Sequence, residues 1–255
     1  MKRLSGVLLR PGYYWDVVKL RHWEENVWKS ASRVVAVSER DARVIRNEVG
    51  AHGQVAVIPN GVDLKQFHFR HRSIHDHPAL LFVGSFSWMQ NRDAVDWLVT
   101  SIWPVIRRKQ SGATMKIVGR KPPDRLRRAI ESAGATLLED VEDISVELNN
   151  AHILIAPIRI GGGTSFKILE AMASGVGVVT TPLGATGLDV SDGRELLIGK
   201  TADEIAGLAC RLVRSPILYR KIAQNARKTI VRGYQWDTIA QSLDRLWYET
   251  AKNRS

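Results

Sequence analysis

The chain has 255 residues, of which 44% are hydrophobic and 25% charged, a composition typical of a globular protein with one large or two small domains. No run of about 18 apolar residues occurs, so no membrane-spanning helix is expected. The single cysteine, Cys210, excludes an internal disulfide framework and favours a reducing, cytoplasmic location. Its apolar neighbours predict a core or half-buried thiol.

The formal net charge of +11 favours acidic partners, such as nucleic acid, anionic lipid head groups or phosphorylated substrates. The cations are spread along the chain instead of forming blocks of like charge. We therefore favour peripheral contact with the cytoplasmic face of an anionic membrane, or with a lipid-linked diphosphate acceptor, over a nucleic-acid surface.

The first 66 residues show two short apolar runs, each preceded by a stretch with helical character. Ser38 follows the first run and is placed to cap a helix, while Pro59-Asn60-Gly61 is a turn signal after the second run. The sequence predicts a helix, a strand, a helix and a strand over 13–30, 33–38, 38–46 and 54–58.

Residues 67–78 lack this alternation and predict a linker. Its four histidines are close enough in sequence to hold a metal ion. Because only Asp76 supplies a carboxylate beside them, a solvated basic linker is favoured over a metal site. The histidines are His68, His71, His75 and His77.

From Ala79 onwards, short apolar runs alternate with helical segments, which predicts an α/β fold with a parallel sheet covered by helices on both faces. Strands are expected near 80–84, 114–118, 136–138, 153–156, 176–180 and 196–198. Helices are expected near 92–110, 123–133, 145–149, 165–174, 202–214 and 217–232. Ligands of such sheets lie beyond the carboxyl ends of the strands. Glycines follow three of these strands, at Gly84, Gly119 and 161–163, so we expect all three places to meet on one rim.

The helix near 165–174 follows three glycines, whose missing Cβ atoms let a ligand approach the backbone. Thr164 or Ser165 is expected to cap this helix and Gly175 to end it. Helical phase places five residues on the apolar face and four on the opposite face. The apolar face is expected to carry Phe166, Ile168, Leu169, Met172 and Ala173, and the opposite face Thr164, Lys167, Glu170 and Ala171.

A helix N-terminus with a nearby lysine favours a phosphate. A carboxylate further along the same stripe, at Glu170, can accept hydrogen bonds from the two hydroxyls of a ribose. The pattern indicates a nucleotide site with Lys167 beside the phosphates. The simpler alternative is a surface helix with Lys167 and Glu170 as a solvated pair, since glycine loops alone are weak evidence. Arg120, just after Gly119, is placed either to meet an anion or to be solvated.

The segment 161–181 (GGGTSFKILEAMASGVGVVTT) closely resembles the donor-site segment of the group 1 (family 4) retaining glycosyltransferases, which have the GT-B architecture. Other motifs match in order, and the resemblance runs from about Ser32 to Leu246. These motifs are 57–63 (VIPNGVD), 81–85 (LFVGS), 115–120 (MKIVGR) and 234–236 (YQW).

This resemblance implies a Rossmann-like C-terminal donor domain preceded by the tail of a second α/β domain. The expected division is an acceptor-domain tail over 1–66, a linker over 67–78, the donor domain over 79–235 and an amphipathic helix over 236–255. Ile239, Leu243, Leu246 and Trp247 form the apolar stripe of that helix, which favours packing over membrane binding. The short N-terminal part predicts a truncated product or a chain completed by a separate acceptor-domain chain.

The resemblance also implies site roles: Glu170 holds the ribose, the glycine loop faces the diphosphate and donor sugar, and Lys167 acts in catalysis. The family often carries a glutamate where this chain has Gly162, and cations where it has only Asn91 and Arg92. Neither a metal ion nor another cofactor is expected. The expected donor-binding residues are Gly84, Asn91, Gly119, Arg120, Gly161, Gly162, Gly163, Thr164, Ser165 and Glu170.

The function expected from these observations is transfer of a sugar from a nucleoside-diphosphate sugar to a hydroxyl of a sugar or lipid-linked acceptor, with retention, in surface glycan or polysaccharide synthesis. The alternative is a nucleotide-sugar-binding module that is catalytically incomplete. A basic nucleic-acid-binding protein is disfavoured because no recognisable module accompanies the charge.

Overall fold

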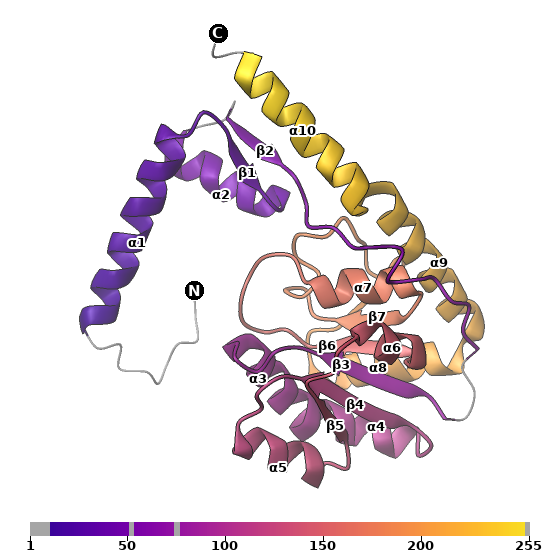
Figure 1. The fold of residues 1–255 in the computed structure, drawn as a ribbon. Coiled ribbons are helices and arrows are strands. Elements are labelled where there is room, and N and C mark those ends of the chain that lie inside the picture. Colours follow the sequence, from indigo (N-terminus) through magenta and orange to yellow (C-terminus); the bar gives the residue numbers. More distant parts are fainter. Residues whose placement is uncertain (1–10, 51–53, 74–76, 253–255) are drawn as a thin grey trace.

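The computed structural model describes residues 11–50, 54–73 and 77–252 (Figure 1). Its largest unit is a sheet of six parallel strands in the order β5-β4-β3-β6-β7-β8. The strands are β3 (Ala79–Val83), β4 (Thr114–Gly119), β5 (Thr136–Glu139), β6 (Ile153–Ala156), β7 (Gly177–Thr180) and β8 (Leu197–Ile198). The predicted α/β fold with a parallel sheet is confirmed, and each strand lies within about one residue of its expected range.

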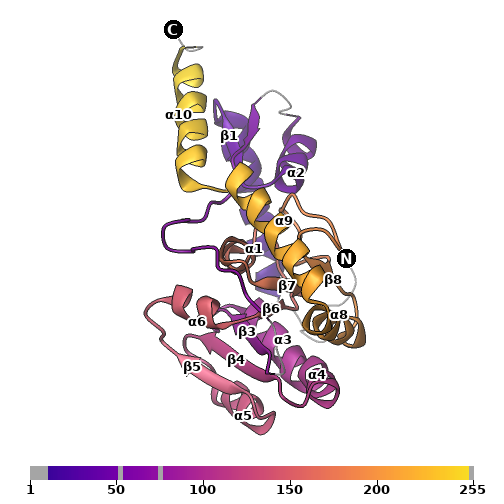
Figure 2. The same cartoon turned by 90° about the vertical axis from the view of Figure 1, so that its right-hand side faces the viewer.

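Helices cover both faces of this sheet, as the sequence predicts, and Figure 2 shows the two layers on either side of the strands. They are α3 (Met89–Trp97), η1 (Leu98–Ile102), α4 (Trp103–Lys109), α5 (Asp124–Ser132), α6 (Ile144–Asn150), α7 (Phe166–Ser174), α8 (Ala202–Arg214) and α9 (Pro216–Gly233). Alternate residues of β3 supply the two cores. Leu80 and Phe82 pack with α3, α4 and α8, whereas Leu81 packs with α6 and α7. This alternation follows from the two-residue period of a strand.

The segment predicted as one helix over 92–110 is divided. A π-helical stretch, η1, separates α3 from α4, and the N–H of Trp103 bonds to the carbonyl of Leu98, five residues back. Pro104 lies in the first turn of α4 and has no N–H to donate. The missing donor accounts for the wider turn just before it. The helix also begins at Met89, earlier than expected.

The N-terminal part forms a small unit of two helices and a parallel pair of strands, in the predicted order. Its elements are α1 (Pro11–Ser30), β1 (Val34–Ala36), α2 (Glu39–Val49) and β2 (Val55–Val57). Ser38 caps α2 as expected, accepting a hydrogen bond from the N–H of Asp41. Its cluster of buried residues is small, since over the described residues it consists of Ala36, Ala42, Ile45 and Val55.

The chain enters the larger unit beside the start of α10 (Trp236–Lys252), where the N–H of Val62 bonds to the carbonyl of Tyr234 at 2.8 Å. Figure 1 shows α10 extending away from the six-stranded sheet towards β2. Ile239 is its only buried residue, while Trp247 and Tyr248 are exposed. The boundaries expected after residues 66, 78 and 235 stay predictions. Over the described residues, no helix is both long and apolar enough to cross a bilayer.

Candidate functional site

A cavity of about 350 Å³ lies at the carboxyl ends of β3 and β6. Counted within the sheet, these are the first and fourth strands, so the order is 3-2-1-4-5-6. The chain leaves β3 and β6 in opposite directions along the sheet, and this switch point is where doubly wound sheets bind ligands. The loop after β3, the glycine loop after β6 and the first turn of α7 line the cavity together.

The three glycines of this loop are not equivalent. Gly161 and Gly163 have φ angles of +112° and +76°, which side chains rarely adopt. Gly162 has no such angle, and a Cβ built there meets no atom within 4 Å. The loop therefore needs glycine at two positions, while Gly162 leaves open space where a side chain fits.

Helix α7 begins after Ser165, which occupies the N-cap position but makes no side-chain capping bond. The expected side-chain cap is thus wrong, because neither hydroxyl bonds to the first-turn amides. The Oγ1 atom of Thr164 is buried without a hydrogen-bond partner among the described residues. The N–H of Ile168 bonds to the carbonyl of Ser165 at 3.1 Å. Phe166 and Lys167 therefore carry the first-turn N–H groups that lack an intrahelical acceptor. This end of α7 is left with donors for an anion, and Gly175 ends the helix in the expected left-handed conformation.

Lys167 is half-buried over the end of the sheet. Its Nζ donates to Oδ1 of Asn91 at 2.7 Å and lies 4.5 Å from the centre of the Phe82 ring. Burial lowers the pKa of Lys167 from 10.5 to about 7, with the charge of Glu170 acting in the opposite direction. An ammonium held away from water beside an open cavity is stabilised by an anionic ligand.

Glu170 lies one turn further along α7 and is also half-buried. Burial raises the pKa of its carboxyl, while the charge of Lys167 lowers it. No described residue donates a hydrogen bond to this carboxylate, so its acceptors are available to a ligand. The predicted stripe of Lys167 and Glu170 thus faces a cavity, and the alternative of a fully solvated surface pair does not fit this geometry.

Asn91 is held in place by its own hydrogen bond, because its Nδ2 donates to the carbonyl of Ser85 at 2.8 Å. Its side chain packs on Gly84, where an added Cβ would lie 2.6 Å from Asn91 Cγ. A Cβ on Gly119 would lie 2.3 Å from the carbonyl oxygen of Gly84. These two glycines therefore allow the ends of β3 and β4 to pack closely.

Gly119 and Arg120 line an adjoining cavity of about 360 Å³, which shares Gly84 and Glu170 with the first. Arg120 is exposed and its Nε lies 3.9 Å from Oδ1 of Asp140. The structure thus brings all expected donor-binding residues to the same rim, but it divides them between two cavities that meet at Glu170.

Arg92 does not reach either cavity and is exposed on α3. Arg159, next to the glycine loop, is also committed elsewhere. It forms two hydrogen bonds to the carboxylate of Asp93, at 2.8 and 3.1 Å, and lies over the Trp97 ring. These contacts anchor the start of the loop to α3 and leave Lys167, among the described residues, as the cation lining the cavity between β3, β6 and α7.

Sequence reasoning missed several residues of the rim. Trp88 is 63% exposed beside the cavity that Lys167 lines, and the available signal was a tryptophan four residues after Gly84. Polar and small lining residues that were also missed include Ser85, Gln90, Leu183 and Gly184 in the same cavity and Gln66 and Glu142 in the adjoining one.

The helical phase assigned two residues of α7 wrongly. Phe166 is 48% exposed although it was expected on the apolar face, and Ala171 is fully buried although it was expected opposite. The helix is packed by the sheet, α6 and α9, so most of its circumference is covered beyond the first turn. Phe166 is the first residue of the helix and lies at the cavity, so these elements do not cover it.

The linker histidines form no metal cluster with Cys, Asp or Glu in the part of the chain that the structure describes. His71 packs edge-on against Phe69, with ring centres 5.1 Å apart, and Nδ1 of His77 lies 3.4 Å from the carbonyl of Gly112. His75 and Asp76 lie outside the described residues.

Together these features define a doubly wound α/β domain with a ligand cavity at its switch point. A family model described as "Glycosyl transferases group 1" matches residues 77–215, and one described as "Glycosyltransferase Family 4" matches residues 9–66. The first match alone covers more than half of the chain, and the chain therefore belongs to the group 1 glycosyltransferases.

Curated relatives agree with this membership. A glycogen synthase of Mycobacterium tuberculosis is 26% identical over 207 residues, covering 76% of this chain and 48% of the relative. A phosphatidyl-myo-inositol mannosyltransferase of the same organism is 29% identical over 224 residues, covering 80% of this chain and 57% of the relative. The chain thus spans about half the length of the curated relatives that it matches.

Solved structures share the fold at lower identity. HepE of Anabaena in complex with UDP is 18% identical with a TM-score of 0.76, covering 94% of this chain and 70% of that one. The C-terminal domain of a group 1 family glycosyl transferase from Francisella tularensis is 20% identical with a TM-score of 0.56. That match covers 69% of this chain and all of the other.

Proposed function

We propose that this chain binds a nucleoside-diphosphate sugar at the cavity between β3, β6 and α7, and transfers the sugar to an acceptor hydroxyl with retention of configuration. The observation that carries this proposal is the pairing of Lys167 and Glu170 on one stripe of α7, both facing the cavity. The donor diphosphate would lie at the first turn of α7, and the ribose hydroxyls would bond to Glu170.

The physical logic is stabilisation of the leaving group. The departing diphosphate gains negative charge in the transition state, and preorganised donors aimed at that charge lower the barrier. Lys167 Nζ and the backbone amides of Phe166 and Lys167 are such donors, with the Thr164 hydroxyl beside them. Glu170 orients the nucleoside and does not act as a base. No metal ion is required in this scheme, because Lys167 and the amides neutralise the diphosphate.

The proposal extends to partners. The acceptor would be a sugar or a lipid-linked glycan used in surface polysaccharide synthesis, and the protein would work in the cytoplasm beside an anionic membrane. The HepE structures are described with UDP and with UDP-glucose, so UDP is the first nucleotide to test. A separate chain carrying an acceptor domain would complete the cleft, and no role for nucleic acid is proposed.

The experiment is a titration of the wild-type chain and Glu170→Ala with UDP, GDP and single-stranded DNA. Loss of the carboxylate should weaken nucleotide binding about tenfold or more, because a hydrogen bond to a charged group contributes about 1.5–3 kcal/mol. Glu131→Ala, an exposed carboxylate on α5, is the matched control and should bind like wild type. Equal affinity of Glu170→Ala and wild type would refute the assignment.

A second candidate function is a nucleotide-sugar-binding module without turnover of its own. Gly162 favours it, because this position often carries a glutamate in the related enzymes and here offers no group to the donor sugar. A donor-hydrolysis assay with UDP-glucose separates the two candidates. Binding accompanied by hydrolysis or transfer supports the enzyme, whereas binding alone supports the module.

A further inference from the structure

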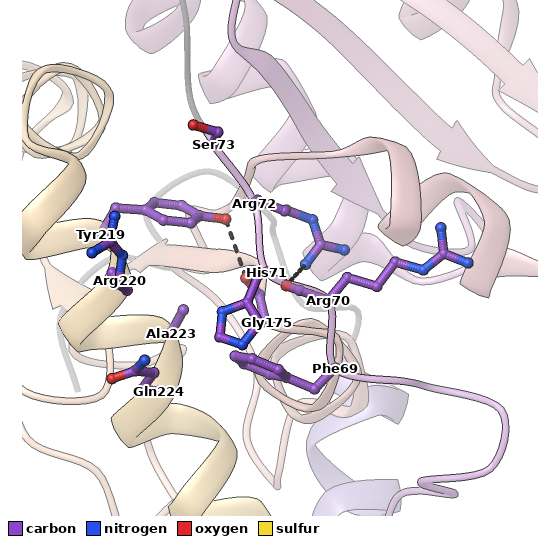
Figure 3. A pocket seen from close by; sticks show the side chains of 10 residues that line it. All are labelled: Phe69, Arg70, His71, Arg72, Ser73, Gly175, Tyr219, Arg220, Ala223 and Gln224. Carbon is purple, nitrogen blue, oxygen red and sulfur yellow. Dashed lines mark hydrogen bonds between the residues drawn. The ribbon is translucent and has the colours of Figure 1, made fainter.

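A third cavity, of about 260 Å³, lies at the opposite end of α7 from the donor site. Figure 3 shows it between the linker residues 69–73, Gly175 at the end of α7, and the first turns of α9. Among the described residues, its lining contains three arginines and a histidine but no carboxylate. The whole chain has 37 Lys and Arg residues against 26 Asp and Glu, so this lining is more basic than the chain as a whole.

The lack of acidic residues extends beyond the lining. Helix α9 carries five basic residues and no acidic one over Pro216–Gly233. Residues 64–75 add cations and contain no acidic residue, although Asp76 follows them in the linker. Charges within about 10 Å still act on one another at physiological salt, so Arg220 and the neighbouring Lys221 are close enough to act on the cavity. Arg232 lies about 18 Å further along the helix and pairs with Asp189. The basic residues of α9 are Arg220, Lys221, Arg227, Lys228 and Arg232.

Arg72 is the half-buried cation of this cavity. Its terminal nitrogens donate to the carbonyls of Arg70, Leu148 and Ser174. Its Nε is buried with no partner in the described part of the chain, and none of its bonds is to a carboxylate. Burial lowers the pKa of Arg72, and the charge of Arg70 acts in the same direction. The guanidinium is therefore fixed in position but its charge is uncompensated, a state that an anion would stabilise.

The remaining lining does not supply negative charge. Burial raises the pKa of Tyr219 to about 12, so its hydroxyl stays neutral and bonds to the carbonyls of His152 and Gly175. Figure 3 shows the His71 ring in the middle of the cavity, while the Arg70 side chain extends away from it. The groups left for a ligand are the imidazole of His71, the guanidinium of Arg220 and the side chains of Ser73 and Gln224.

The backbone under the cavity is fitted to this shape. Gly175 has a φ of +76°, and a Cβ there would lie 2.8 Å from the Phe69 ring and 2.9 Å from the carbonyl oxygen of Arg70. The linker can therefore lie directly on the end of α7, which brings His71 and Arg72 opposite α9. Arg227 fastens the same region by donating to the carbonyls of Phe67 and Ala173.

We propose that this cavity is a binding site for a phosphate monoester and is separate from the donor site. Arg220 and His71 would contact the phosphate, and the positive charge of Arg72 would attract it. Guanidinium groups bind phosphate through paired N–H donors. The same dianionic chemistry is found in a soluble phosphorylated sugar and in the head group of phosphatidic acid.

The test is a titration with inorganic phosphate and with glucose 6-phosphate at low salt, and a flotation assay with phosphatidylcholine vesicles with and without phosphatidic acid. Arg220→Glu should weaken binding of its preferred probe about tenfold or more. Lys228→Glu makes the same change of charge on the exposed face of α9, outside the cavity lining, and should alter binding less than about threefold. If Arg220→Glu loses binding of inorganic phosphate or glucose 6-phosphate, the ligand is a free phosphate. If it loses only the binding to vesicles that contain phosphatidic acid, the ligand is the lipid.

A further variant separates this site from the donor site. Lys167→Met should leave the phosphate binding that depends on Arg220 unchanged. If phosphate instead binds at the first turn of α7, its binding would be lost in Lys167→Met and retained in Arg220→Glu. That reversed result would overturn the proposal, as would equal losses in Arg220→Glu and Lys228→Glu or no binding in either arm. None of these outcomes depends on nucleotide binding at Glu170, which is measured separately.

Discussion

Nucleotide binding should be coupled to the uptake of a proton by Lys167. In the empty site the pKa of this lysine is about 7. A diphosphate beside Nζ favours the ammonium form and raises the pKa again. At pH 8 about one tenth of the empty sites carry the charged lysine, so binding should take up about 0.9 proton per nucleotide.

The same equilibrium sets the affinity. Each pH unit above 7 makes the charged form about tenfold rarer, so the dissociation constant for UDP should rise about 25-fold between pH 7.5 and pH 9. The lower limit of pH 7.5 is chosen because the second pKa of a phosphate lies near about 6. Above that limit the ligand keeps a constant charge.

The assay is titration calorimetry at pH 8 in two buffers with different enthalpies of ionisation, in which the difference between the binding heats counts the protons. Lys167→Met should bind UDP more weakly and show the same heat in both buffers. Glu170→Gln should bind weakly yet still take up the proton, because its lysine is intact. Equal heats for the wild type in the two buffers would refute the reasoning about Lys167.

Three further predictions concern stability. Gly163→Ala should lower the melting temperature by about 2–4 °C or more, because a side chain at positive φ costs about 1–2 kcal/mol. Gly162→Ala should change the melting temperature by less than about 2 °C. Similar shifts for the two variants would contradict the loop geometry. Gly119→Ala should cost about 3 kcal/mol or more in urea unfolding, because its Cβ would overlap the Gly84 carbonyl. Lys167 has a folded-state pKa below its unfolded value of 10.5, so it destabilises the fold at neutral pH and this cost fades as pH rises from about 7 to 10.5. Unfolding of Lys167→Met at pH 7 and pH 10 should show the larger gain in stability at pH 7.

The sheet and its helices could be predicted because their signals are local. Each strand of the larger unit is a short apolar run, and Gly175 ends α7 where the pattern places it. The rim of the site followed from one rule, that loops after parallel strands share an edge. Lys167 and Glu170 could be placed on one stripe because they are three positions apart on a helix.

The errors arise where long-range packing decides. Ala171 is buried because α6, α9 and the sheet surround α7, which helical phase within one segment cannot indicate. The π-helical stretch before Pro104 depends on a lost backbone donor. Arg120 was grouped with the glycine loop from its place after a strand, yet two residues on one rim can face different cavities. The cavity beside Arg72 had no sequence signal, since the linker and α9 are about 150 residues apart.

Helix α7 has only nine residues, so its ends are about 13 Å apart. Its first turn borders the proposed donor cavity, and Gly175 at its other end borders the arginine-lined one. Its middle is too tightly packed to bend without opening a void. The helix is therefore expected to move as one rigid unit. A shift along its axis that widens the cavity at one end would also displace the lining of the cavity at the other end.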